Sequence, residues 1–172
     1  EKAGSRFKNA DNLKRLIGLI DDTEWTAMDV DVKAAVFEGL LEKAASEGKK
    51  GAGQYFTPRL LIQTIVRCVR PDPRSRAELT VCDPACGTGG FLVGAWEWFL
   101  AENGGAPPAG DLRQRVRRGT YFGQELVDRP RRLALMNLYL HGLEPEIRKG
   151  DSIYGPHDGR RFDVVLTNPP FG

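Results

Sequence analysis

The chain has 172 residues, of which 41% are hydrophobic and 28% are charged, and its formal net charge is +2. This composition matches an average globular protein and excludes fibrous, collagen-like and wholly disordered classes, and so small a net charge does not by itself indicate a nucleic-acid partner. No apolar run approaches the roughly 18 residues that span a bilayer and the start does not resemble a signal peptide, so we expect a cytoplasmic protein with no membrane partner.

Helical patterns dominate the first part of the chain. Apolar residues recur at helical spacing over 8–20 and over 29–45, where Val32, Val36 and Leu40 share one stripe. These patterns predict two amphipathic helices. We therefore interpret residues 1–50 as a helical segment and residues 51–172 as a separate domain.

The second helix is followed by a glycine-rich run and then by a further helix signal. GKKGAG at 48–53 predicts a hinge that closes the second helix. Thr57 and Pro58 predict the N-cap and first turn of a third helix, which Pro71 ends.

From residue 79 the pattern alternates between strands and helices. Strands are predicted at 79–85, 120–126, 145–151 and 161–168, and helices at about 91–99 and 128–141. Residues 102–111 are predicted to be a turn-rich loop. This alternation predicts a parallel sheet covered on both faces, with ligands at the carboxyl ends of its strands.

Charged and thiol side chains give weaker signals. Seven arginines lie between residues 111 and 132 against three acidic residues, which favours a solvated surface, with phosphate contact as the alternative. Cys68, Cys82 and Cys86 are an odd number without C-x-x-C spacing, which argues against a disulfide framework and a structural zinc site. We predict no metal site.

The loop DPACGTGGF at 83–91 follows a predicted strand and opens a helix, so a ligand could touch its backbone. It lacks the Gly-Lys-Ser/Thr of a P-loop. It also lacks a full dinucleotide fingerprint, because Leu92 stands where a third glycine is needed. Asp83, ahead of the glycines, suits a cationic ligand group better than a pyrophosphate.

Acidic residues end three consecutive predicted strands around this loop: Asp83, Glu125 and Asp151. The two carboxylate oxygens of Glu125 can accept both hydroxyls of a ribose. Each acid also has a structural alternative, as a loop cap, a solvated acid or a turn former. Their joint placement predicts a crevice for a nucleoside that carries a cation.

The tetrapeptide NPPF at 168–171 follows the last apolar strand. Pro169 and Pro170 fix an extended backbone and remove two N–H donors. The amide oxygen of Asn168 and a neighbouring carbonyl can accept both hydrogens of an exocyclic amine, which aims the nitrogen lone pair at a methyl carbon. Phe171 offers a face on which an extruded base can stack. The alternative is a proline-terminated strand with a core phenylalanine.

Taken together, DPACGTGGF, GQE at 123–125, GDS at 150–152 and NPPF resemble the S-adenosylmethionine-dependent DNA adenine-N6 methyltransferases. GQYFTP at 53–58, the run LMNLYLHG and the closing DVVLTNPPFG resemble, more narrowly, the methylation subunit of type I restriction-modification systems. The resemblance covers about residues 32–172. It implies an α/β fold with a Rossmann-like parallel sheet that is truncated after its fourth strand. The end of an N-terminal helical domain would precede this sheet in the chain.

The resemblance implies S-adenosylmethionine as cofactor and assigns roles position by position. The methionine part would lie on Asp83 and on the backbone of the loop, which includes Ala85, Cys86, Gly87 and Gly89. Glu125 would take the ribose hydroxyls, Asp151 the adenine amino group, and Thr57 would lie near the methionine carboxylate, where a helix start favours an anion. For the Cys86 side chain we expect a packing role.

The implied reaction is methyl transfer to N6 of a flipped adenine in DNA. Two rival functions stay open: a related NPP-motif enzyme that methylates protein glutamine or RNA, and a cofactor-binding or assembly module without turnover. The chain lacks an initial methionine and ends directly after NPPFG, so we expect a part of a longer protein whose partners are DNA and specificity and restriction subunits. By itself, this part is expected not to methylate DNA.

The family's strand order, 3-2-1-4-5-7-6, predicts that the strand before NPPF lies at an edge of the sheet. We expect its apolar residues Val164, Val165 and Leu166 to be uncovered. Such an edge invites pairing with another chain, so self-association is expected.

Overall fold

The computed structural model describes residues 7–28, 30–47, 57–76, 78–156 and 158–170. Its helices are α1 (Ala10–Asp21), α2 (Val30–Glu47), α3 (Arg59–Val69), α4 (Gly90–Glu102), α5 (Gly110–Gly119) and α6 (Asp128–Leu140). Its strands are β1 (Val81–Asp83), β2 (Tyr121–Glu125), β3 (Glu146–Lys149) and β4 (Val164–Val165). Among the described residues, no helix is both long and apolar enough to cross a membrane.

The four strands form one parallel sheet in the order β3-β2-β1-β4. Val81 of β1 pairs with Tyr121 of β2 on one side and with Val164 of β4 on the other. The parallel sheet and the place of β4 beside β1 confirm the fold predicted from the sequence. The carboxyl ends of all four strands therefore meet at one edge, where the glycine loop follows β1.

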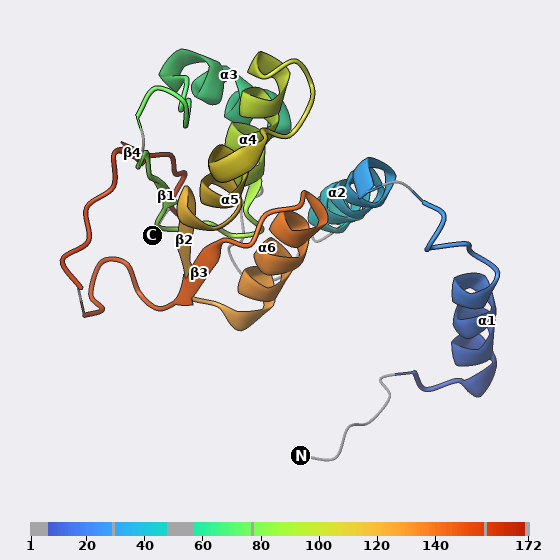
Figure 1. Cartoon of the computed structure of the whole chain (residues 1–172). Coiled ribbons are helices and arrows are strands. Elements are labelled where there is room, and N and C mark those ends of the chain that lie inside the picture. Colours follow the sequence, from blue (N-terminus) through green and yellow to red (C-terminus); the bar gives the residue numbers. More distant parts are fainter. Residues whose placement is uncertain (1–6, 29, 48–56, 77, 157, 171–172) are drawn as a thin grey trace.

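The hydrophobic core lies between the sheet and helices α4 and α6. α4 buries most of its length, including Phe91, Leu92 and Phe99, because it packs on the sheet on one side and against α3 on the other. α6 adds Ala134 and Leu138. Figure 1 shows α1 apart from this body, and no residue of α1 is buried.

The second face of the sheet differs from the prediction of helices on both faces. Alternate residues of β2, Phe122 among them, point away from the core. Phe122 meets Phe162 of the loop between β3 and β4, with ring centroids 5.4 Å apart, and the guanidinium of Arg160 lies 5.7 Å from the Phe122 centroid. In the described part of the chain, a loop thus occupies the place where we expected a helix.

The buried face of α2 also differs from the predicted apolar stripe. On α2, Val32, Val36 and Leu40 are exposed, whereas Ala34 is buried and the helix packs against α6. Helices that approach another element closely need small residues there, so the widest apolar side chains do not mark the buried face.

Helix α5 is an element that the sequence analysis did not predict. Val116 is its only buried residue, and its arginines 113, 115, 117 and 118 are exposed. Arg117 and Arg118 both pair with Glu144, and the Arg118–Glu144 distance is 2.7 Å. Leu112 and Val116, four residues apart, form the short apolar face that packs on the core. The exposed arginines on the rest of the helix agree with the solvated-surface interpretation.

The edge strand β4 is less open than expected. Val165 is 56% exposed, but Leu166 is only 2% exposed and Val164 is half-buried. The amide of Leu166 donates to the carbonyl of Cys82 at 2.9 Å, which continues the pairing beyond β4. The prediction that all three residues are uncovered was wrong for Leu166, because its side chain points into the core. Self-association through this edge stays a prediction.

The contact between α3 and α4 depends on a residue without a side chain. A Cβ placed on Gly94 would lie 2.6 Å from Cγ2 of Ile62. We expect Gly94→Ala to lower the free energy of unfolding by about 1 to 3 kcal/mol, because the helices must move apart. Urea unfolding measures this, with Gly39→Ala as the control, since Gly39 has nothing within 4 Å of its Cβ position. A Gly94→Ala protein as stable as wild type would contradict the packing argument.

Candidate functional site

The glycine loop turns the chain from β1 into α4 and needs glycine at two positions. Gly87 and Gly89 have positive φ angles of +54° and +85°. Such angles strain other residues, and a Cβ on Gly89 would also lie 3.3 Å from Cδ1 of Leu138. The Cys86 amide donates to the carbonyl of Gln124 at 2.9 Å, which ties the loop to the end of β2. The loop is thus a turn of fixed conformation in which Gly87 and Gly89 leave the backbone accessible to a ligand.

Two loop side chains serve different purposes. Asp83 is 2% exposed, its Oδ1 accepts the amide of Ala85 at 3.1 Å, and its burial raises the pKa of the carboxyl to about 6. Cys86 is buried beneath Gly123, and burial raises the pKa of its thiol well above the usual range. Asp83 therefore suits a cationic group, whereas Cys86 is a packing residue, as the sequence predicted.

Glu125 joins the glycine loop to the end of β2. Its Oε2 accepts the amide of Gly87 at 2.9 Å, and its Oε1 accepts the amide of Val127 at 2.9 Å. Each carboxylate oxygen keeps a lone pair for a further donor. The sequence predicted that Glu125 and the loop share one site, but not that they bond directly.

Asp151 lies in the loop after β3. Its Oδ1 accepts the amides of Ile153 and Tyr154 at 2.8 and 3.0 Å, and these bonds hold the pKa of the carboxyl below its usual range. The Ser152 hydroxyl donates to the carbonyl of Pro84, which draws this loop toward the glycine loop. Oδ1 thus has a structural role, and Oδ2 is the oxygen that can receive a ligand donor.

The NPP residues follow β4 at the same edge of the sheet. The amide Nδ2 of Asn168 donates to the hydroxyl of Thr57 at 3.2 Å, and Pro169 and Pro170 are exposed. Phe171 and the predicted hinge at 48–53 lie outside the described residues. The predicted capping role of Thr57 was wrong: α3 begins after Pro58 and has no side-chain cap bond.

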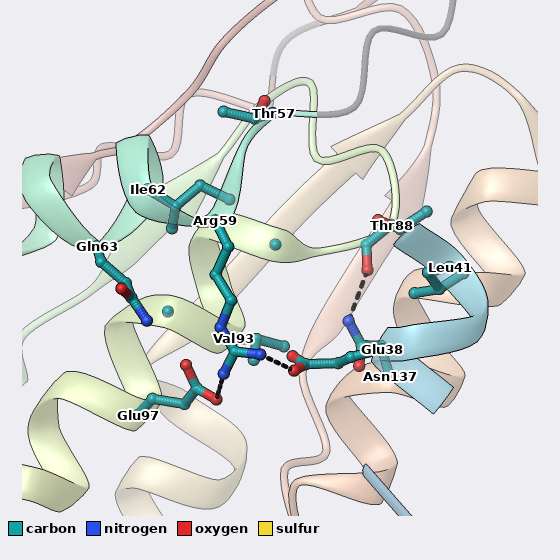
Figure 2. Close-up of a pocket in the computed structure, with 12 residues that line it drawn as sticks. Glu38, Leu41, Thr57, Arg59, Ile62, Gln63, Thr88, Val93, Glu97 and Asn137 are labelled. Atoms are coloured by element: carbon teal, nitrogen blue, oxygen red, sulfur yellow. Dashed lines mark hydrogen bonds and ion pairs between the residues drawn. The ribbon is translucent and has the colours of Figure 1, made fainter. Parts of the chain in front are cut away.

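A cluster that the sequence analysis missed lies beside this edge. Arg59 donates to Glu38 at 2.6 Å and to Glu97 at 2.7 Å (Figure 2). Nε2 of His141 lies 3.7 Å from a carboxylate oxygen of Glu38. The four residues come from four helical regions far apart in sequence, so no local motif marks them. Two carboxylates and an imidazole could hold a metal ion, but in this arrangement the cation between the carboxylates is the guanidinium of Arg59.

The cluster borders a small cavity that reaches the start of α3. The cavity has a volume of about 40 Å³ and includes Thr57, Thr88 and Asn137 in its lining. The buried amide of Asn137 donates to the carbonyl of Thr88 at 3.2 Å, so α6 holds the glycine loop in place (Figure 2). In the sequence, Asn137 stands among apolar residues of the predicted helix over 128–141, and this was the one signal that pointed to the bond.

Comparison with known sequences connects this site to a family. Residues 28–172 match the family model N-6 DNA Methylase. The chain is 40% identical over 172 residues to the type I restriction enzyme StySPI methylase subunit of Salmonella potsdam, a match that covers 93% of this chain and 32% of that protein. It is 42% identical over 145 residues to the EcoKI methylase subunit of Escherichia coli K12, covering 80% and 27% respectively.

Solved structures give the same result. The EcoKI M protein is 39% identical and superposes with a TM-score of 0.61 over 70% of this chain and 26% of its own. A chain from a study of assembly and conformational transition in the type I R-M system is 33% identical, with a TM-score of 0.77 over 94% of this chain and 32% of its own. The chain spans between 26% and 32% of the length of these relatives. On this evidence, it belongs to the N-6 DNA methylase family.

Proposed function

We propose that this chain is the cofactor-binding and catalytic part of an adenine-N6 DNA methyltransferase of the type I methylase-subunit kind. The observation that carries the proposal is the edge of the sheet at which four strand ends meet. Asp83 and Glu125 surround a bare glycine loop there, Asp151 is drawn to it by Ser152, and Asn168 follows the neighbouring strand. Residues 1–50 would then be the end of a helical domain and residues 51–172 the start of the catalytic domain.

The proposed cofactor is S-adenosylmethionine, and the residues at this edge fit it. Asp83 and the loop backbone from Ala85 to Gly89 would receive the methionine part, because a buried carboxylate favours a nearby cation. Glu125 offers two oxygens with spare lone pairs to the ribose hydroxyls. Oδ2 of Asp151 would accept the adenine amino group.

The NPP residues supply the acceptor side of the proposed reaction. Bound S-adenosylmethionine provides an electrophilic methyl group. The Asn168 amide oxygen and a neighbouring backbone carbonyl would accept the two hydrogens of the adenine amine and hold its nitrogen in line for attack. Phe171 would stack on the flipped base. Asn168 needs no negative charge for this role, because it positions the amine and does not deprotonate it.

The proposed partners follow from the relatives. DNA would be the substrate, and specificity and restriction subunits would bind the complete protein, as expected for a type I system. A second candidate is a cofactor-binding or assembly module without turnover. It is one of the two rival functions that the sequence left open.

Methyl transfer from radiolabelled S-adenosylmethionine tests the proposal. The complete protein that carries this chain is incubated with duplex DNA, single-stranded DNA, RNA and glutamine-containing peptides, and the product is digested and identified. N6-methyladenine in DNA is the expected product. Label only in RNA or in glutamine would establish the rival NPP chemistry, and cofactor binding without label in any acceptor would establish the module without turnover.

Cofactor affinity is expected to depend on pH through Asp83. The carboxyl has a pKa of about 6, so it is ionised above this pH and protonated below it. A cationic ligand favours the ionised form, so affinity should fall about tenfold for each pH unit below 6. Calorimetric titration with S-adenosylmethionine between pH 5 and pH 8 measures this. In Asp83→Asn the affinity should be weaker and flat over that range; the same slope in both proteins would assign the titration to another group.

The same pKa has the opposite effect on the ligand-free fold. The folded pKa of Asp83, about 6, lies above the unfolded value of about 3.9, so the folded state binds the proton more tightly. The stability contributed by this residue is therefore present below pH 4 and is lost as pH rises to about 6. For Asp83, the pH range that favours cofactor binding thus differs from the range in which its protonation stabilises the fold.

A further inference from the structure

The hydrogen bond between Thr57 and Asn168 joins residues that lie 111 positions apart. Thr57 precedes α3, and its hydroxyl does not cap that helix, since the amides of Leu61 and Ile62 use the Pro58 carbonyl instead. Within the described residues, Asn168 is the hydrogen-bond partner of this hydroxyl. The bond therefore has no part in forming α3.

Both ends of this bond are held by their surroundings. Arg59, two residues after Thr57, pairs with Glu38 and Glu97 and so anchors the start of α3. Two residues before Asn168, Leu166 is buried and bonds to β1 through its backbone. The hydroxyl and the amide thus face each other from two anchored segments.

The orientation of the Asn168 amide decides whether it can hold an amine. With Nδ2 toward Thr57, Oδ1 points to the other side and can accept a hydrogen from adenine. Rotated by half a turn, the amide would present its own NH₂ group to the amine, and two donors would face each other. A threonine hydroxyl can donate or accept, so by itself it permits both orientations.

A ligand that takes the hydroxyl hydrogen would remove this ambiguity. If the hydroxyl donates to an anionic group, its lone pairs are left to accept, and only Nδ2 of Asn168 can then bond to it. Thr57 shares the lining of the small cavity with Thr88 of the glycine loop, and it lies at the start of α3, where a helix N-terminus favours an anion such as the carboxylate of the proposed cofactor. That carboxylate is an anion of the required kind.

We propose that Thr57 is a positioning residue that sets the Asn168 amide in its amine-accepting orientation when the cofactor is bound. This inference rests on the proposed methyltransferase function. It explains why the hydroxyl faces Asn168 and not its own helix. It also predicts that the protein distinguishes an amine-bearing base only when the cofactor site is filled.

Thr57→Val tests the inference, since it keeps the shape and removes the hydroxyl. In the complete protein at saturating S-adenosylmethionine, kcat should fall about 10- to 100-fold, because a misplaced acceptor group costs on that order. Thr57→Ser should recover most of this loss. An unchanged kcat for Thr57→Val, with only a weaker cofactor affinity, would make Thr57 a cofactor ligand alone and overturn the proposal.

A binding experiment gives a second readout that does not depend on turnover. Duplexes with adenine or with purine, which lacks the amino group, at the target position are titrated with and without S-adenosylhomocysteine. The wild type should prefer adenine about tenfold only with the cofactor product bound, and Thr57→Val should lose the preference. A preference that Thr57→Val retains would overturn the inference.

Two controls distinguish a failure of the inference about Thr57 from a failure of the proposed methyltransferase function. In an Asn168→Asp background no NH₂ group needs orienting, so adding Thr57→Val should lower kcat no further. Thermal melting identifies any variant that fails to fold; if Thr57→Val does, Thr57→Ala, which also lacks the hydroxyl, carries the comparison through adenine preference. If the unmodified protein methylates no acceptor, the proposed function fails; if it does and Thr57→Val matches it, only the role of Thr57 fails.

Discussion

Asn168→Ala is expected to reduce methyl transfer by the complete protein about 100- to 1,000-fold while S-adenosylmethionine binding stays within about threefold. The amide oxygen is a preorganised acceptor for the adenine amine, and removing one such group costs this much in other enzymes. Cofactor affinity should change little, because Asn168 follows β4, whereas the proposed cofactor residues Asp83 and Glu125 end β1 and β2. The Nδ2 atom of Asn168 is directed at Thr57. Single-turnover transfer of radiolabelled methyl groups measures the rate, and calorimetry measures the affinity.

Asn103→Ala is the matched control for Asn168→Ala. Asn103 caps the far end of α4, and its amide donates to the carbonyl of Ala106 at 2.7 Å, away from the glycine loop. This variant should transfer methyl groups at the wild-type rate. A rate for Asn168→Ala within threefold of the control would remove Asn168 from the reaction.

Glu125→Ala is expected to weaken S-adenosylmethionine binding about 100-fold or more. Two charge-assisted bonds to the ribose hydroxyls would be lost, each contributing about 1.5 to 3 kcal/mol, and about 1.4 kcal/mol corresponds to a factor of ten. The same change removes the acceptor of the Gly87 amide, so the loop loses its tie to β2. Isothermal calorimetry on the complete protein measures the affinity.

Two further variants define what Glu125 contributes. Glu144→Ala removes a carboxylate at the opposite end of the sheet, where it pairs with Arg117 and Arg118, and should leave cofactor binding unchanged. Glu125→Gln keeps the shape but sets an NH₂ group against one of the two backbone amides, so an intermediate loss is expected. Equal affinities for Glu125→Ala and Glu144→Ala would place the ribose elsewhere.

Much of the site could be predicted because its residues follow strands. A strand and the loop after it are local in sequence, and parallel strands bring their carboxyl ends to one edge. Asp83, Glu125, Asp151 and Asn168 could therefore be assigned to a common edge from the alternation of strands and helices alone. The positive φ angles at Gly87 and Gly89 are also a local property of the sequence, because glycine adopts such angles more readily than other residues.

By itself, then, the sequence determined the parallel sheet and the acidic residues at the strand ends, whereas the strand order near the loop came from the family resemblance. Only the tertiary structure decided that Thr57 bonds to Asn168 across 111 positions and that Arg59 lies between Glu38 and Glu97. It also decided which helix faces are buried and that Val116 holds α5 to the core. The reason is physical: these contacts form between elements that meet only after the chain has packed, and a local hydrophobic period carries no information about which element a side chain will meet.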